Sequence, residues 1–292
     1  MKLIKPSFQI LNPIGYTLKD IYKSIELAAR TCYKSENLIT EDSAEKFVNM
    51  IKDRQHTAML EHGTIYLAMP METMLPIEAN GWGKYSKNPY SKGFKVCEVN
   101  GESRVAVTTN YRVLYENNWL EDLQYLCEPT EYHEKRLSVR FICDRGILAE
   151  FTRHRVFSFA VESTRYCNYS KSKFNNEITC IIPCWTDIPE GDYGSRLLPK
   201  IPQDGTQDGV AQNFIDNCRY SEETYFHLLE NGWIPQQARA VLPNSLKTEL
   251  IMTGFVSDWI HFFKLRDSNT AHPSARELAA PLHQEMINLK LI

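Results

Sequence analysis

The sequence lacks any long apolar run. No stretch of the 292 residues approaches the roughly 20 that a helix needs to span a bilayer. The first residues, Met-Lys-Leu-Ile-Lys-Pro, do not contain the apolar stretch of a signal peptide. There is also no internal repeat and no low-complexity tract. These absences argue against membrane, secreted and repeat proteins, and we expect a cytoplasmic location.

A metal motif is lacking as well. The eight cysteines are scattered through mostly apolar contexts, and we expect reduced thiols that serve as packing groups. Cys180 and Cys184 are spaced loosely like metal ligands, but no second cysteine or histidine pair accompanies them. His56 and His62 do not form a His-Glu-x-x-His motif. The sequence therefore predicts no metal site.

What is present is the composition of a globular α+β protein. With 43% hydrophobic and 24% charged residues, the chain can bury a substantial core as one large or two small domains. Apolar periodicity and turn signals predict helices and strands that alternate irregularly. The predicted helices cover 17–34, 43–52, 111–127, 211–229 and 275–289. The predicted strands cover 61–69, 94–99, 104–108, 137–143 and 177–182, and Asn100-Gly101 predicts a tight hairpin turn.

Positive charge is concentrated in one segment of a chain whose net charge is −3. Residues 151–175 contain five Lys and Arg against a single acid, Glu162, a local excess of roughly +4. Arginine pairs bidentately with phosphate or carboxylate, and the hydroxyls of Ser158, Ser163 and Thr164 add short-range donors. The segment therefore indicates a site for anionic groups.

Within this segment, Arg153-His154-Arg155, then Ser163, Arg165 and Tyr166, resemble the signature of the flavin-dependent thymidylate synthases. Further blocks resemble the family in the same order. They are Ala28 to Tyr33, His56 to His62 (His-x4-Glu-His), Ala238 to Pro243, and Leu265-Arg266. The resemblance covers most of the chain, from 28 to 266.

The resemblance implies a twisted, mainly antiparallel sheet flanked by helices, in a single domain over 1–292. It implies reductive methylation of dUMP to dTMP at C5, with methylenetetrahydrofolate as carbon donor, FAD as cofactor and NADPH as reductant. It also implies a homotetramer with sites built across subunits. No cysteine nucleophile is needed, because the flavin carries the difficult chemistry.

The resemblance also implies roles for particular residues. Arg266 would pair with the uracil ring and stabilise its ionised form, which makes it the catalytic candidate. The remaining candidates are flavin contacts or substrate contacts. The cofactor-binding set is His56, Ala58, Glu61, Arg153, His154, Arg155, Ser257 and His261. The substrate-binding set is Glu150, Arg153, Glu162, Ser163, Thr164, Arg165, Arg239 and Arg266. Simpler interpretations are a surface ion pair of Arg266 with Asp267 and a helix-packing ion pair of Arg239.

Several positions depart from the family pattern. Ala160-Val161 stands where the family has Asn-Glu, Glu150 replaces a Gln, and Phe255, Ser257 and His261 replace polar flavin contacts. Two alternatives to thymidylate synthesis therefore stay open. One is a same-fold enzyme that modifies another pyrimidine nucleotide or installs another one-carbon group, and the other is a non-catalytic nucleotide-binding homologue.

An insertion relative to smaller family members is predicted at about 70–134, outside the core sheet. Within it, residues 81–95 interleave four lysines with four aromatics and contain no acid. This pattern fits a surface loop with solvated lysines, a lid over a nucleotide, or a nucleic-acid surface. The acidic net charge argues against the last of these. A second excursion, 186–212, is rich in Pro, Gly and Asp and predicts a loop.

Overall fold

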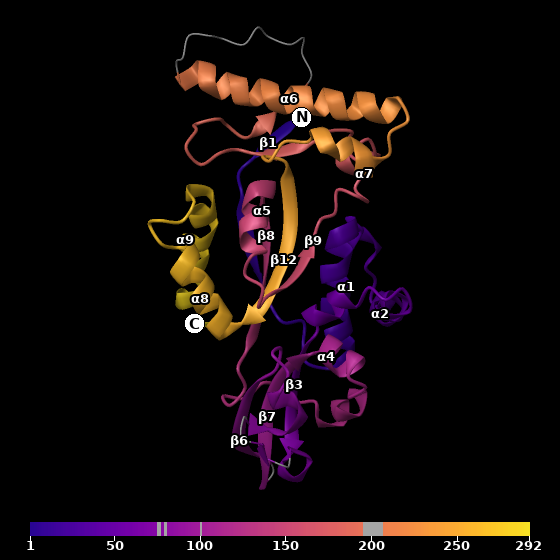
Figure 1. Ribbon diagram of the computed structural model, residues 1–292, viewed down its shortest axis with the longest axis vertical. Helices are drawn as coiled ribbons and strands as arrows, with labels where there is room; N and C mark the ends of the chain where they lie inside the picture. The colour runs from indigo at the N-terminus through magenta and orange to yellow at the C-terminus, as the bar shows by residue number, and fades with distance from the viewer. Residues whose placement is uncertain (75–76, 79–80, 100, 195–206) are drawn as a thin grey trace.

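The computed structural model describes residues 1–292 except 75–76, 79–80, 100 and 195–206. It confirms a mixed fold of helices and mainly antiparallel sheets, elongated in Figure 1. The strands are divided among several small sheets, of which the four-stranded antiparallel one is the largest. The sheet orders are β2-β8-β12-β9, β3-β7-β6, β10-β1-β11 and β4-β5.

The strand bounds are β1 Lys2–Ile4, β2 Ser7–Leu11, β3 Thr64–Pro70, β4 Ile77–Glu78, β5 Gly81–Trp82, β6 Lys92–Val99, β7 Glu102–Asn110, β8 Arg136–Asp144, β9 Ser158–Val161, β10 Thr179–Ile181, β11 Gly191–Asp192 and β12 Lys247–Phe255. The α-helix bounds are α1 Leu18–Tyr33, α2 Ser43–Asp53, α3 Gly83–Ser86, α4 Tyr111–Glu116, α5 Arg145–Phe151, α6 Gln207–Glu230, α7 Pro235–Ala238, α8 Val256–Arg266 and α9 Pro273–Asn288. Short 3-10 helices include η2 Thr57–His62, η4 Leu120–Tyr125 and η6 Arg239–Val241.

The antiparallel sheet β2-β8-β12-β9 forms the middle of the molecule (Figure 1). β12 is buried on both faces. Leu250 and Met252 pack into one cluster with Trp259 of α8, whereas Ile251 packs with Ala28 of α1 and Ala160 of β9. Each fully buried apolar side chain of this kind contributes roughly 1.5–3 kcal/mol. This burial explains why the middle of β12 is the apolar run Leu250–Met252, for which a period-two search gives no signal.

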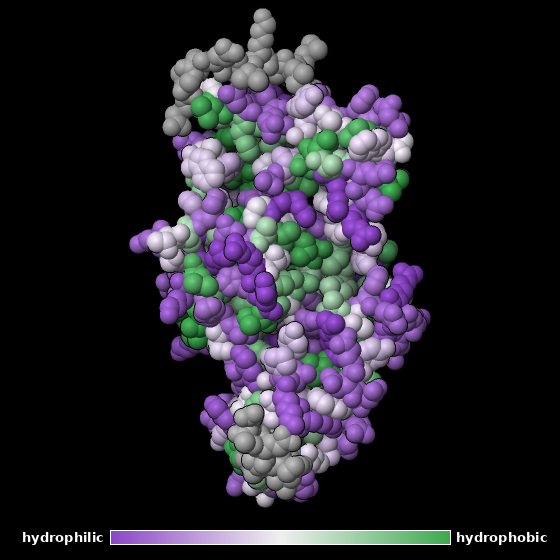
Figure 2. All heavy atoms as spheres, in the orientation of Figure 1, coloured by the Kyte–Doolittle hydropathy of each residue, from purple (hydrophilic) through white to green (hydrophobic). Residues whose placement is uncertain are grey.

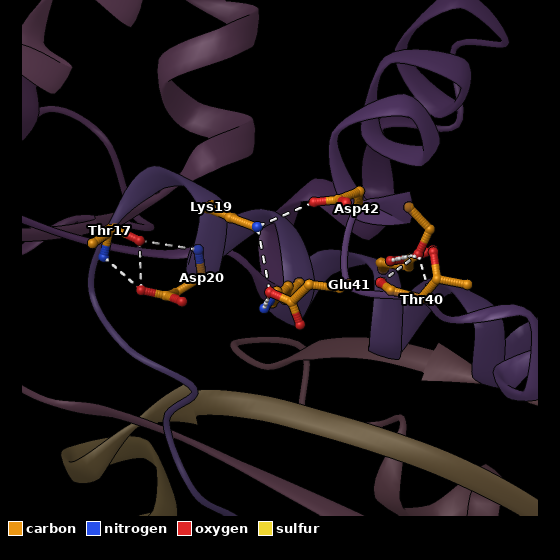
Figure 3. A network of polar contacts seen from close by, with 9 residues as sticks. Thr17, Lys19, Asp20, Thr40, Glu41 and Asp42 are labelled. Atoms are coloured by element: carbon orange, nitrogen blue, oxygen red, sulfur yellow. Dashed lines mark hydrogen bonds and ion pairs between the residues drawn. The ribbon is translucent and has the colours of Figure 1, made fainter.

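Helix α1 begins at a well-formed cap. The Thr17 hydroxyl accepts a hydrogen bond from the Asp20 amide, and the Asp20 carboxylate accepts one from the Thr17 amide, which is a capping box. Lys19 then reaches Glu41 and Asp42 just before α2 (Figure 3). These contacts set where α1 starts, and the helix ends at Tyr33, one residue before the predicted end.

The structure corrects several sequence expectations. The helix expected over 111–127 ends at Glu116, because Asn118 adopts a left-handed backbone (φ 58°), and η4 follows. The strand expected from Glu61 begins at Thr64, and the strand expected over 177–182 is limited to β10. The 186–212 segment contains β11 and the start of α6, and the rest of it lies partly outside the described residues.

The 70–134 segment forms the sheet β3-β7-β6 with the strand that precedes it. Figure 1 shows this sheet at the lower end of the molecule, away from the middle sheet. The expected hairpin is confirmed, with Val99 opposite Glu102, although Asn100 in its turn lies outside the described residues. The lysine-rich stretch is not a simple solvated loop. Tyr85 is fully buried and Lys84 pairs with Asp122 at 2.7 Å.

None of the helices in the described ranges is long and apolar enough to cross a membrane.

Candidate active site

The Arg-His-Arg segment leaves the end of α5 and leads into β9. Phe151 anchors it in the core, and His154 is buried with its ring against Phe157 and Phe262. Arg153 and Arg155 point outward and are exposed. In the part of the chain that the structure describes, neither guanidinium has a hydrogen-bond or ion-pair partner. Two uncompensated positive charges therefore flank a fixed, buried imidazole.

Arg266, the last residue of α8, lies against this segment. Its Nε donates to His154 Nε2 at 2.9 Å, its Nη2 donates to the Glu150 carbonyl at 2.9 Å, and its Nη1 pairs with the Glu150 carboxylate. Burial, with a contribution from Arg266, lowers the pKa of His154 to about 4. The imidazole is therefore neutral near pH 7 and accepts the Arg266 bond. The alternative pairing with Asp267 is wrong, since Asp267 contacts His283 at 2.8 Å.

A second group lies at the other end of β9. The Ser163 amide donates to the Cys32 carbonyl at 3.0 Å, and the Arg165 amide donates to Ser163 Oγ at 3.3 Å. Arg239 donates to Thr164 Oγ1 at 3.3 Å. The alternative in which Arg239 pairs with an acid is therefore not what the structure shows. Arg165 is exposed, with its guanidinium near the ring of Tyr166.

The N-terminal blocks meet this second group through Tyr33. The Tyr33 ring lies 5.2 Å from that of Tyr166, and its hydroxyl is 3.3 Å from His56 Nδ1. His56 and Ala58 are both exposed beside it. Residues about 110 positions apart in the sequence thus lie on one surface, and Tyr33 is a connecting residue that the sequence did not single out.

Glu162 does not face an open surface. Because side chains alternate along a strand, Glu162 follows Ala160 onto one face and leaves Val161 on the other. It is 2% exposed and pairs with Lys247 at 2.8 Å, which also pairs with Glu249 at 2.7 Å. Lys34 pairs with Glu249 as well. Burial opposes the charge of Glu249, but Lys247 and Lys34 outweigh it and lower its pKa to about 2.

The remaining predicted residues lie elsewhere. Glu61 is bound by Arg112, and Ser257 is bound by Glu134 and by Lys92 Nζ at 2.8 Å. His261 is exposed on α8 and is near enough to His154 for its charge to contribute to the lowered pKa of that imidazole. Phe255 is buried beneath Lys92, whose Nζ is 4.5 Å from the ring centroid.

The sequence did not predict that the 70–134 segment would reach the α8 start. The alternation of lysines and aromatics in 81–95 indicated that this stretch has a role, but it did not predict that Lys92 would contact Ser257.

A cavity of about 720 Å³ borders Glu150. It lies between α5, the start of α6 and the 183–189 segment, and its walls include Trp185, Phe214 and His272. The ring of Trp185 is 62% exposed and contacts His272 edge-on. Sequence patterns gave no signal for this cavity, because its walls come from distant segments.

Comparison with known proteins identifies the family of the chain. The family described as "Thymidylate synthase complementing protein" matches residues 129–289, which is more than half of the chain and contains α5, β9, β12 and α8. The chain belongs to this family, and the resemblance seen in the sequence is confirmed.

Curated relatives are moderately similar. A probable flavin-dependent thymidylate synthase of Paramecium bursaria Chlorella virus 1 is 31% identical over 135 residues, covering 46% of this chain and 58% of the relative. A flavin-dependent thymidylate synthase of Haloarcula marismortui is 29% identical over 166 residues, covering 55% of this chain and 64% of the relative. The chain thus spans somewhat less than two thirds of the relatives it matches.

Among solved structures, the chain resembles a UMP/dUMP methylase, PolB, from Streptomyces cacaoi, bound with 5-Br UMP. The identity is 14%, the TM-score is 0.44, and the match covers 99% of this chain and 92% of that one.

Proposed function

We propose that the protein is a flavin-dependent thymidylate synthase, which methylates dUMP at C5 with methylenetetrahydrofolate, FAD and NADPH. The observation that carries the proposal is the contact of Arg266 with His154 and Glu150, which joins two separate family blocks at one place. Membership of the family and the names of the curated relatives support it.

Phosphate binding fits the arginines at the two ends of β9. Arg153 and Arg155 precede the strand, and Arg165 and Arg239 belong to the group beyond it. All four are exposed, and none pairs with a carboxylate in the described part of the chain. Guanidinium groups in this state keep their capacity for bidentate phosphate bonds. We assign Ser163, Thr164, Arg165 and Arg239 to the nucleotide.

The flavin fits the residues before β9. FAD carries a pyrophosphate, and the unpaired guanidiniums of Arg153 and Arg155 provide the charge to hold it. When bound, the flavin would supply the hydride-transfer chemistry. The positions Phe255 and Ser257 do not offer free polar contacts, because Lys92 and Glu134 already occupy them. We therefore propose that flavin binding depends on the arginines more than on the start of α8.

Base activation falls to Arg266. Its guanidinium is oriented by neutral His154 and by Glu150, so that a uracil ring at its remaining surface would meet a fixed positive charge. Such a charge stabilises the negative charge that develops on the ring when C5 becomes nucleophilic. Glu150 must then move or share Arg266 with the base.

A second candidate function rests on Glu150. A carboxylate accepts hydrogen bonds where an amide would also donate one, and Glu150 borders the 720 Å³ cavity. A pyrimidine that presents an amino group, as cytosine does, would suit it better than uracil. We therefore keep, as the alternative, modification of another pyrimidine nucleotide. A non-catalytic nucleotide-binding protein is the further alternative.

We also propose assembly into a homotetramer with sites shared between subunits. Val156 and Tyr166, which adjoin the site arginines, are 55% and 53% exposed. The side of the molecule drawn in Figure 2 carries apolar side chains near its middle, around the β9 and β12 region of Figure 1. Apolar surface beside charged groups is typical of an interface. Light scattering coupled to size exclusion should give four times the chain mass.

The activity is tested by flavin retention and NADPH oxidation. Purified protein is incubated with FAD, desalted and scanned in the visible range, and anaerobic NADPH oxidation is then followed with dUMP, with dCMP and without nucleotide. Retained flavin and stimulation by dUMP support the proposal. Stimulation by dCMP alone would favour the alternative substrate, and dUMP binding without flavin would favour the non-catalytic protein.

A further inference from the structure

A small cavity lies apart from the proposed active site. It measures about 90 Å³ and is enclosed by the 11–16 segment, α1 and the strands β3, β8 and β12. None of its lining residues belongs to the flavin or nucleotide groups assigned above. At roughly 30 Å³ for each water molecule, it has room for about three waters or one small ion, and it is too small for a nucleotide.

Arg136, the first residue of β8, lines this cavity and is only 8% exposed. A guanidinium has five N–H donors. Nη1 donates to the Glu61 carbonyl at 3.0 Å and to Thr64 Oγ1 at 3.2 Å, and Nη2 donates to Ser158 Oγ at 3.2 Å. Nε has no partner. Two donors, the Nε–H and one Nη2–H, are therefore left over inside the protein.

The charge of Arg136 has no ion-pair partner among the described residues; the Phe255 ring lies 5.5 Å from its guanidinium, and Glu61 and Asp258 act on it only from farther away. All three acceptors are neutral oxygens, and no aspartate or glutamate lines the cavity. Arg136 contacts the backbone carbonyl of Glu61, but the carboxylate of Glu61 is bound by Arg112. Burial lowers the pKa of Arg136 to about 10, so it still carries its charge at neutral pH. A buried unpaired charge is costly, and most buried arginines are paired.

Other groups in the cavity wall suit an anion. His62 is neutral at physiological pH, because burial and the nearby Arg136 lower its pKa to about 3. Ser138 and Tyr16 place hydroxyl groups in the same wall, and hydroxyls can donate to an anion. The cavity thus combines one buried cation with neutral donors.

We propose that this cavity binds one small monovalent anion of the size of formate, held by Arg136 through its free Nη2–H donor, because the Nε atom is fully buried. A carboxylate matches a guanidinium in shape and charge, and a halide matches it in charge. The ion would neutralise Arg136, which links Thr64 at the start of β3 to Ser158 of β9 in the middle sheet. Anion binding would therefore stabilise the packing of the sheet β3-β7-β6 against the middle sheet.

The test is thermal unfolding of the full chain in increasing sodium formate, at ionic strength held constant with the bulky anion 2-(N-morpholino)ethanesulfonate. We expect a saturable rise of the unfolding temperature with formate, as ligand linkage requires. Ile14→Trp, which fills the cavity from its exposed side, should abolish the saturable rise. Ile39→Trp is the matched control, because Ile39 is similarly exposed and does not line the cavity, and it should keep the rise.

Arg136→Lys keeps the charge but loses the planar fork, so the formate concentration at half-saturation should increase about tenfold. An equal rise in wild type and Ile14→Trp, or no rise in wild type, would overturn the proposal. If the variants do not fold, wild-type crystals soaked in bromide decide the matter. An anomalous peak beside the Arg136 guanidinium in the cavity is expected, and water alone at that place contradicts the proposal.

Discussion

Replacing Lys247 with methionine should destabilise the protein strongly. The Lys247 ammonium lies 2.8 Å from the Glu162 carboxylate and 2.7 Å from that of Glu249. Methionine keeps the length of the side chain but removes the charge. Glu162, at 2% exposure, would be left with Tyr169 as its one close partner, at 3.5 Å. Breaking a buried pair from one side costs about 3–5 kcal/mol, which is a large part of the stability of a typical domain.

The assay is urea unfolding at pH 7, with Lys264→Met as the matched control. Lys264 is exposed on α8, so its replacement should change the free energy of unfolding by no more than about 0.5 kcal/mol. Adding Glu162→Gln to Lys247→Met removes the stranded charge and should recover part of the loss. If Lys247→Met lowers the free energy of unfolding by less than about 1 kcal/mol, Lys247 does not compensate a buried charge on Glu162 and Glu249.

The same variant should change the acid stability. The pKa of Glu249 is lowered from 4.5 to about 2 in the folded protein, so its contribution is complete above pH 4.5 and is lost as the pH falls through 2. A shift of that size corresponds to about 3 kcal/mol. In Lys247→Met, the free energy of unfolding should fall less steeply between pH 4.5 and 2. An unchanged slope would mean that Lys247 does not lower this pKa.

Three further predictions concern the site. Arg165→Ala should raise the dissociation constant of dUMP about tenfold or more without affecting flavin retention, and equal binding in titration calorimetry would count against a phosphate contact. Glu150→Gln should raise the dUMP-to-dCMP ratio of kcat/KM, because an amide can donate as well as accept; an unchanged ratio would remove Glu150 from base recognition. His154→Phe should flatten the pH dependence of unfolding between pH 6.5 and 4. The lowered pKa of His154 makes stability decrease as the pH falls through that window, and a retained slope would assign it to other groups.

Local patterns predicted α1, α2 and the hairpin of β6 and β7 well, but they missed α5, α8 and β12. Thr17 and Asp20 cap α1 through contacts three residues apart, and the Asn-Gly turn signal lies between two strands that pair, so both are encoded in short stretches. The break at Asn118 was missed, because apolar spacing alone does not reveal one residue in a left-handed conformation.

The spacing of the signature residues identified the family but did not reveal their contacts. It assigned Arg266 to the uracil ring and His154 to the flavin, and the bond between the two side chains depends on how α8 and α5 pack. Nothing local predicted that Lys92 would cross to Ser257, or that Glu162 would turn inward to Lys247. Long-range ion pairs are set by tertiary packing, which no sequence window contains.

The most direct test of the proposed function is formation of dTMP. Wild type and Arg266→Ala, each reconstituted with FAD, are incubated with dUMP, methylenetetrahydrofolate and NADPH. The nucleotides are then separated by chromatography and identified by mass spectrometry. The account predicts dTMP from wild type and none from Arg266→Ala, which should still retain flavin. Absence of any methylated nucleotide from flavin-loaded wild type, or equal turnover by Arg266→Ala, would contradict it.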